Sequence, residues 1–264
     1  MLVLAFVAFS LIAGEKFYDP GNISIITQQV MVVGAIAVAQ SLVILTAGID
    51  LSVGALMVLT SVVMGKLAVE VGWPTPLALL AGLVVGASCG LLNGLLVTRF
   101  KLPPFITTLG TLSIFQALNL YISESQTIGA TTLERDAPML QWMGKAFNIG
   151  GFVINTGVLL MIGLFVVMWF ALTWTAWGRH VYAVGSDPGA ARLAGIRTDR
   201  VLLSVYVVAG TICAIAAWIS IGRNAVSPQA NAEQLELLSI TAVVIGGISL
   251  FGGRGSVFGA LIGA

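Results

Sequence analysis

The residues best suited to chemistry lie in the stretch ILTAGIDLSVGALM, where Asp50 and Ser52 stand between two apolar runs. If these runs cross a bilayer, a carboxylate at that depth is costly and is a candidate for function. Gly48 and Gly54 would permit a broken or tightly turned backbone, which is tolerated at depth where it lines a cavity. The alternative is a tight cytoplasmic hairpin in which Asp50 caps the next helix. The residues themselves leave both interpretations open.

Other polar residues are embedded in apolar segments along the chain. Such groups must face protein or a water-filled path, and some hydrogen-bond only between helices. The candidates for lining a substrate path are Gln40, Asp50, Ser52, Asn93, Thr107, Thr108 and Asn119.

Motifs for catalysis are lacking. The sequence contains no G-x-x-x-x-G-K-[ST] phosphate loop, no H-E-x-x-H and no G-x-S-x-G. Cys89 and Cys213 lie inside apolar segments, as small buried hydrophobes do, and His180 beside Arg179 suits a solvated or lipid-facing position. We therefore predict no catalytic residue, no metal site, no cofactor and no enzyme activity. A net charge of +1 also gives no reason to expect binding to nucleic acid.

The segment 178–200 is the most informative polar stretch. Asp187 can cap a helix and Pro188 suits its first position, so residues 188–194 are predicted to form about two turns that stop at Gly195. A short helix flanked by arginines is a good docking element for a partner. The alternative is a basic loop held by anionic headgroups. The predicted docking residues are Asp187, Pro188, Gly189, Ala190, Ala191, Arg192, Leu193 and Gly195.

Composition indicates the element that must position these residues: a bundle of membrane-spanning helices. Hydrophobic residues make up 58% of the 264 residues and charged residues only 9%, against about 25% in soluble domains. Spans need roughly 20 apolar residues, and the short alternating segments of a barrel are not seen. We predict an all-α polytopic fold with spans at 1–14, 23–47, 51–69, 75–98, 104–122, 152–175, 201–221 and 235–250, and a ninth starting near Ser256.

Positive charges set the orientation of this bundle. One set of connections holds Arg99, Lys101, Arg179, Arg192, Arg197, Arg200 and Arg254, and the other holds Lys16, Lys66, Arg135, Lys145 and Arg223. The set of connections with more Lys and Arg residues is expected on the cytoplasmic side. We therefore expect 178–200 to be cytoplasmic and the polar segment 123–150 to be external. Glycines at every fourth position, Gly82 to Gly94 and Gly255 to Gly263, predict faces where a second helix approaches closely.

Four stretches carry a resemblance to a known family. They are TAGIDLSVGA at 46–55, NGLLVTRFKLPPFITTLG at 93–110, AWGRHVYAVGSDPGAARLAGI at 176–196 and SITAVVIGGISLFGGRGSVFGALIGA at 239–264. They resemble the permease subunits of bacterial monosaccharide ATP-binding-cassette importers, the ribose, xylose and fructose group. LPPFITTLG and GGISLFGGRGS are most similar to the fructose branch.

The resemblance implies a fold, partners and a location. It implies a fold of about ten spans, so residues 1–264 would be a single transmembrane permease domain truncated at both ends. Expected partners are a cytoplasmic ATP-binding subunit docked on 178–200, a periplasmic sugar-binding protein, a second permease copy in a homodimer, and membrane lipid. The location would be the bacterial inner membrane. The alternative function is an ion-coupled secondary transporter of a small polar solute, although Asp50 is the only acid near a span.

Overall fold

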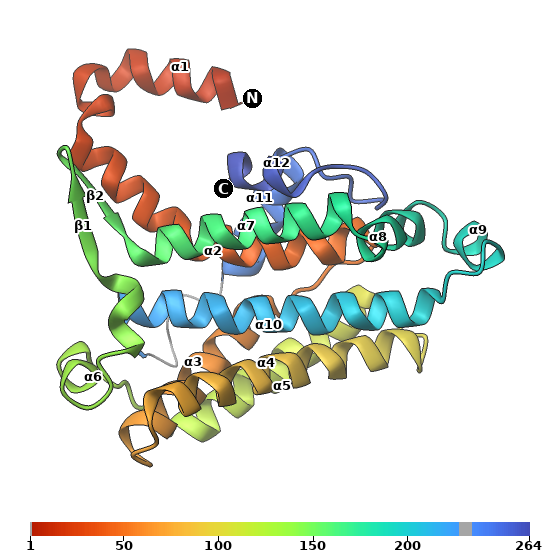
Figure 1. Ribbon diagram of the computed structural model, residues 1–264, viewed down its shortest axis with the longest axis horizontal. Coiled ribbons are helices and arrows are strands. Elements are labelled where there is room, and N and C mark those ends of the chain that lie inside the picture. Colours follow the sequence, from red (N-terminus) through yellow and green to blue (C-terminus); the bar gives the residue numbers. More distant parts are fainter. Residues whose placement is uncertain (1, 227–233) are drawn as a thin grey trace.

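The computed structural model describes residues 2–226 and 234–264, so Met1, which opens the first predicted span, lies outside the described residues. The chain is a bundle of roughly parallel and antiparallel helices (Figure 1). In order, its elements are α1 (Leu2–Ala13), the 3-10 helix η1 (Gly14–Tyr18), α2 (Pro20–Leu45), α3 (Val53–Val69), α4 (Thr75–Thr98), α5 (Pro104–Ser123), α6 (Ala130–Asp136), the 3-10 helix η2 (Leu140–Gly144), β1 (Ala146–Ile149), β2 (Phe152–Asn155), α7 (Thr156–Trp174), α8 (Ala176–Ser186), α9 (Pro188–Leu193), α10 (Thr198–Asn224), α11 (Leu235–Ile245) and α12 (Val257–Gly263).

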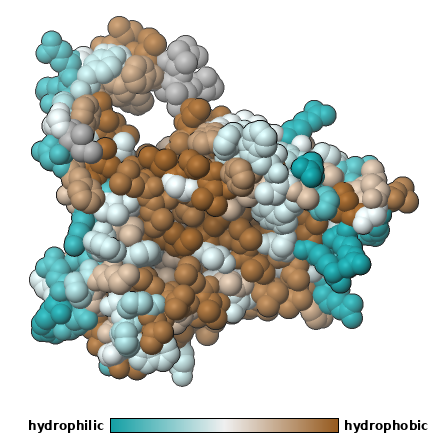
Figure 2. Space-filling model, viewed as in Figure 1, coloured by the Kyte–Doolittle hydropathy of each residue, from teal (hydrophilic) through white to brown (hydrophobic). Residues whose placement is uncertain are grey.

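Five helices of the described chain, α2, α4, α5, α7 and α10, are long and apolar enough to cross a membrane, and α3 and α11 are shorter apolar helices. The space-filling view shows apolar side chains over the middle of the molecule and hydrophilic groups gathered toward its two ends (Figure 2). This distribution suits a bundle whose long axis crosses a bilayer. The predicted polytopic helical fold is confirmed.

Several predicted boundaries need correction. Residues 152–155, placed in a span, form strand β2, which pairs antiparallel with β1 through a turn at Gly150 and Gly151, both at positive φ. The predicted span 235–250 ends as a helix at Ile245, because the chain turns at Gly246 and Gly247. The span predicted at 201–221 is longer, since α10 runs from Thr198 to Asn224.

Helix α1 is shorter than a span. Its 12 residues extend about 18 Å, against about 30 Å for a bilayer core. The ring of Phe6 packs edge-on against Phe17 of η1, and Phe9 stacks on the same ring. Its assignment to a first span at 1–14 stays a prediction.

Helix α10 lies at the centre and packs on α4, α2 and α3. Its contact with α4 is made of backbone: a Cβ added at Gly86 would lie 2.6 Å from the carbonyl oxygen of Gly210, and one at Gly90 would overlap the carbonyl of Tyr206. Gly259 and Gly263 likewise meet the backbone of Gly246 and Ala242. The predicted close approach is confirmed at Gly86, Gly90, Gly259 and Gly263, where backbone lies against backbone, whereas Gly255 lies outside a helix at φ +123°.

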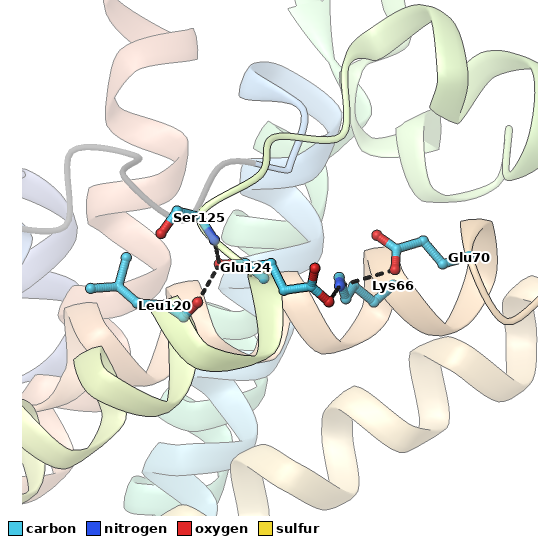
Figure 3. Close-up of polar contacts among 6 residues, drawn as sticks. Lys66, Glu70, Leu120, Glu124 and Ser125 are labelled. Atoms are coloured by element: carbon cyan, nitrogen blue, oxygen red, sulfur yellow. Dashed lines mark hydrogen bonds and ion pairs between the residues drawn. The ribbon is translucent and has the colours of Figure 1, made fainter.

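The two ends of the bundle are tied by different ion pairs. At one end Lys66 of α3 contacts Glu70 at 3.0 Å and Glu124, just past α5, at 3.4 Å (Figure 3). At the other, Lys101 of the α4–α5 connection pairs with Asp199 of α10 at 2.9 Å. The predicted external segment 123–150 lies at the Lys66 end, where it folds into α6, η2 and β1, while α8 and α9 lie at the Lys101 end (Figure 1).

Candidate functional site

Asp50 lies in a buried polar cluster between α2 and α3. Its carboxylate accepts hydrogen bonds from the backbone N–H and the hydroxyl of Ser52, both at 2.7 Å. The Asn93 amide of α4 in turn donates to the Ser52 hydroxyl at 2.9 Å. All three side chains are buried. A buried carboxylate keeps its place only when hydrogen bonds replace lost water, and Ser52 supplies two of them.

Thr108 of α5 fixes the same segment from the other side. Its hydroxyl donates to the carbonyl of Ile49 at 3.2 Å and accepts from the N–H of Leu51 at 3.1 Å. At Ile49 and Leu51 the irregular backbone between α2 and α3 is therefore hydrogen-bonded to a side chain of the bundle. Irregular backbone at membrane depth needs partners of this kind.

The segment 46–52 joins α2 and α3, which both pack on the central helix α10. Apart from α10, α2 packs mainly on α11 and α7, and α3 packs mainly on α4 and α5. Asn93 stands five residues before the end of α4, about 7 Å inside that end. Asp50 does accept the N–H just ahead of α3, as a cap would. Its part in a substrate path stays a prediction.

The remaining path candidates are dispersed. Gln40 and Thr107 are buried, but within the described residues their polar side-chain atoms have no hydrogen-bond partner, so neither is bonded to the Asp50 cluster. Asn119 is buried eleven residues beyond Thr108, about 16 Å farther along α5. The fold thus brings together four of the seven candidates: Asp50, Ser52, Asn93 and Thr108.

Tyr206 of α10 is a buried polar residue that sequence reasoning missed. Within the described chain its hydroxyl has no hydrogen-bond partner. A Cβ added at Gly48 would lie 3.3 Å from this hydroxyl, which places Tyr206 against the segment that carries Asp50. A tyrosine in the middle of an apolar run was the available signal, because the phenol needs a polar neighbour when it is buried.

The short helix predicted at 188–194 is present as α9, and Ala194 is its C-cap residue. The Asp187 carboxylate accepts from the N–H groups of Gly189 at 2.8 Å and Ala190 at 3.0 Å. Gly195 follows at φ +85°, a left-handed conformation that ends the helix. The predicted capping is confirmed. Docking of a partner at α9 stays a prediction.

Helix α9 presents one apolar side chain fully to the outside. Leu193 is 92% exposed, whereas Ala191 is 5% exposed and lies against the bundle. Gly189 and Ala190 are exposed on the outer side. These exposed residues are the ones that the predicted docking of a partner would use, with Leu193 as the apolar side chain that can enter a groove.

Helix α8 was not predicted. Thr175 accepts from the N–H of Gly178 at 3.1 Å and so caps it. Val181 and Val184 are buried, while Arg179 and His180 are exposed, so the helix is amphipathic. Tyr182 donates to the carbonyl of Gly255 at 2.8 Å, and burial raises the pKa of this phenol.

A glycine junction, made of Gly185, Gly252 and Gly253, links α8 to the end of α2. The Gly253 N–H donates to the carbonyl of Leu45 at 2.9 Å. A Cβ at Gly185 would overlap that same carbonyl, and one at Gly252 would lie 2.7 Å from the Ala47 nitrogen. Backbone therefore touches backbone from the helix before α9 to the segment leading to Asp50.

Comparison of the sequence with known proteins places the chain in a family. A family model described as branched-chain amino acid transport system / permease component matches residues 22–264. The chain is 52% identical over 265 residues to the fructose import permease protein of Rhizobium meliloti, covering 100% of this chain and 73% of that protein. It is 38% identical over 252 residues to the ribose import permease protein of Bacillus subtilis (96% and 76% covered). It is 33% identical over 253 residues to the autoinducer 2 import system permease protein of Photorhabdus luminescens (95% and 73%). No solved structure matches.

Proposed function

This chain belongs to the family of permease components of branched-chain amino acid transport systems, and we propose that it is the membrane subunit of an ATP-driven bacterial monosaccharide importer. The relatives are import permeases, which are transport components and not enzymes. The predicted resemblance to sugar import permeases and the prediction of a non-enzymatic membrane protein are thereby confirmed. The sugar, the energy source, the partners and the inner-membrane location belong to the proposal.

The observation that carries the proposal is the connection from α9 to Asp50. Helix α9 projects from the bundle with Leu193 exposed. Through α8 and the glycine junction it reaches Leu45 and Ala47 by backbone contacts that leave no room for a side chain. A movement of α9, caused by a cytoplasmic ATP-binding subunit bound to it, would therefore be passed on to the segment 46–52. The contacts are between backbones, so the movement would not be absorbed by flexible side chains. No phosphate-binding loop occurs in this sequence, so ATP chemistry falls to that partner.

A second permease copy and a periplasmic sugar-binding protein complete the proposed importer. Two of the relatives are named as import permeases for fructose and for ribose, so a monosaccharide is the substrate class we propose. The test is uptake of labelled fructose, ribose and xylose by vesicles that hold the permease, its ATP-binding subunit and its binding protein. We expect ATP-dependent uptake of one of these sugars above the others. Uptake of none of them under conditions where the complex hydrolyses ATP would contradict the substrate class.

Replacing Asp50 is expected to lower the rate of uptake strongly and the stability of the fold only modestly. Asp50→Ala removes the acceptor for Ser52, which costs about 0.5–2 kcal/mol as the loss of a cap does. Because Asn93 and Thr108 still hold the segment, the protein should assemble, and its uptake rate should fall at least tenfold.

Asp50→Asn is the matched control, because it keeps an oxygen acceptor for Ser52 and removes the charge. Uptake is measured beside thermal melting in detergent for both variants. Near-normal uptake by an assembled Asp50→Ala complex would leave Asp50 with a capping role alone.

A further inference from the structure

An open cavity of about 540 Å³ lies beside α9, between α8 and the start of α10. Trp177 and His180 contribute from α8, and Arg197, Arg200 and Ser204 from the α9–α10 connection and the first turns of α10. The cavity shares Gly195 with the predicted docking residues and lies beside their exposed face, and none of the substrate-path candidates lines it.

The cavity is positively charged. Within the described residues neither Arg197 nor Arg200 makes an ion pair. The nearby carboxylate of Asp199 is held by Lys101 at 2.9 Å, so it is directed to another cation. The N-terminal end of α10, 27 residues long, adds its dipole with the positive end at the cavity. The uncompensated charge favours an anion with several acceptor oxygens, which guanidinium groups bind by paired hydrogen bonds.

One wall of the cavity is apolar and fixed. The Trp177 indole N–H donates to the Ser204 hydroxyl at 2.8 Å, which holds the ring, and Ile196 and Val201 extend this wall. Trp174, 66% exposed at the end of α7, stands where interfacial aromatic residues stand in membrane proteins. Amphipathic α8 likewise suits the plane of the interface. A ligand here meets guanidinium groups on one side and hydrocarbon on the other.

We propose that this cavity binds the phosphate headgroup of an anionic phospholipid. The phosphate lies between Arg197 and Arg200, and the glycerol and first acyl carbons lie along Trp177. Because the connection from α9 to α10 lines the cavity, a bound headgroup steadies the base of α9. The binding itself needs only the membrane-spanning bundle. Lipid binding can therefore be measured whether or not the protein is coupled to ATP hydrolysis.

The test compares lipid binding by two double variants with equal loss of charge. Arg197→Gln with Arg200→Gln removes the cavity's guanidinium groups. Arg179→Gln with Arg254→Gln removes two exposed arginines at the same end that do not line the cavity. Binding of phosphatidylglycerol and of phosphatidylcholine to the purified protein is measured by native mass spectrometry. Thermal melting checks that each variant is folded.

We expect the cavity variant to bind phosphatidylglycerol about twenty-fivefold more weakly than wild type, since each of the two basic residues near an anionic headgroup contributes roughly fivefold. The control variant should stay within about threefold of wild type, and phosphatidylcholine binding should not differ. Equal losses in the two variants would overturn the proposal, because they would show diffuse attraction. Displacement of the lipid by millimolar inorganic phosphate would also overturn it, in favour of a soluble phosphate ligand. If the cavity variant fails to melt cooperatively, Arg200→Gln alone is compared with Arg254→Gln by the same criteria.

Discussion

Ala190→Trp is expected to abolish sugar uptake while the permease still folds and inserts. Ala190 lies on the exposed side of α9, and its backbone N–H is bonded to Asp187, so the helix itself is unaffected by a larger side chain. An indole at this position overlaps any groove that receives a face of small residues. The variant should therefore lose co-purification with the ATP-binding subunit, or keep ATP hydrolysis without uptake.

The matched control is Ala176→Trp, at an exposed position of α8 near the membrane interface, where tryptophan is well tolerated. The control should retain uptake. Normal uptake by the Ala190→Trp complex would remove α9 from the coupling mechanism. Loss of the permease from the membrane in both variants would point instead to a general defect of insertion.

Among substitutions that add one methyl group to the glycine junction, Gly185→Ala is expected to lower the stability of the protein most. The added Cβ overlaps the carbonyl of Leu45 and lies 2.7 Å from the nitrogen of Gly253. Because both neighbours are backbone, no side-chain rotation relieves the overlap, and overpacking of this kind costs about 1–3 kcal/mol or more. The hydrogen bond from Gly253 to Leu45 should weaken as well.

Thermal melting in detergent measures this loss, and Gly163→Ala in α7 is the control, because an added Cβ there meets nothing within 4 Å. Gly163→Ala should melt at or slightly above the temperature of the wild type, because alanine favours a helix more than glycine does. Where Gly185→Ala protein is recovered folded, its uptake per ATP hydrolysed should drop, since the junction joins α8 to the segment 46–52. Melting and uptake equal to those of Gly163→Ala would show that the junction neither packs tightly nor couples.

The sequence predicts the helices of this protein better than the contacts between them. Long apolar runs identify α2, α4, α5, α7 and α10, and the Asp187-Pro188 pair places the start of α9 correctly. These features depend on residues close together in the chain. Helix α8 is short, and Gly178 and Gly185 within it obscure the pattern. The residues FVIN at 152–155 join a longer apolar run, so their pairing with AFNI is hidden.

The sequence predicts which residues form the candidate site, but it does not predict how they are arranged in space. Asp50 and Ser52 are visible as polar residues between apolar runs. Their partners Asn93 and Thr108 stand 41 and more residues away, and only the packing of α4 and α5 brings them together. The same holds for the glycine junction, where Leu45 meets Gly253. Such contacts arise from tertiary packing, which no local pattern encodes.

We propose that an ATP-binding partner, and no ion gradient, drives this permease. It is tested by uptake of the labelled sugar into vesicles that carry the complete complex, with ATP enclosed on the α9 side and ionophores collapsing all ion gradients. We predict that uptake continues under these conditions and stops when ATP is replaced by a non-hydrolysable analogue. Uptake that persists without hydrolysable ATP and disappears when the gradients are collapsed would contradict the account and favour an ion-coupled transporter.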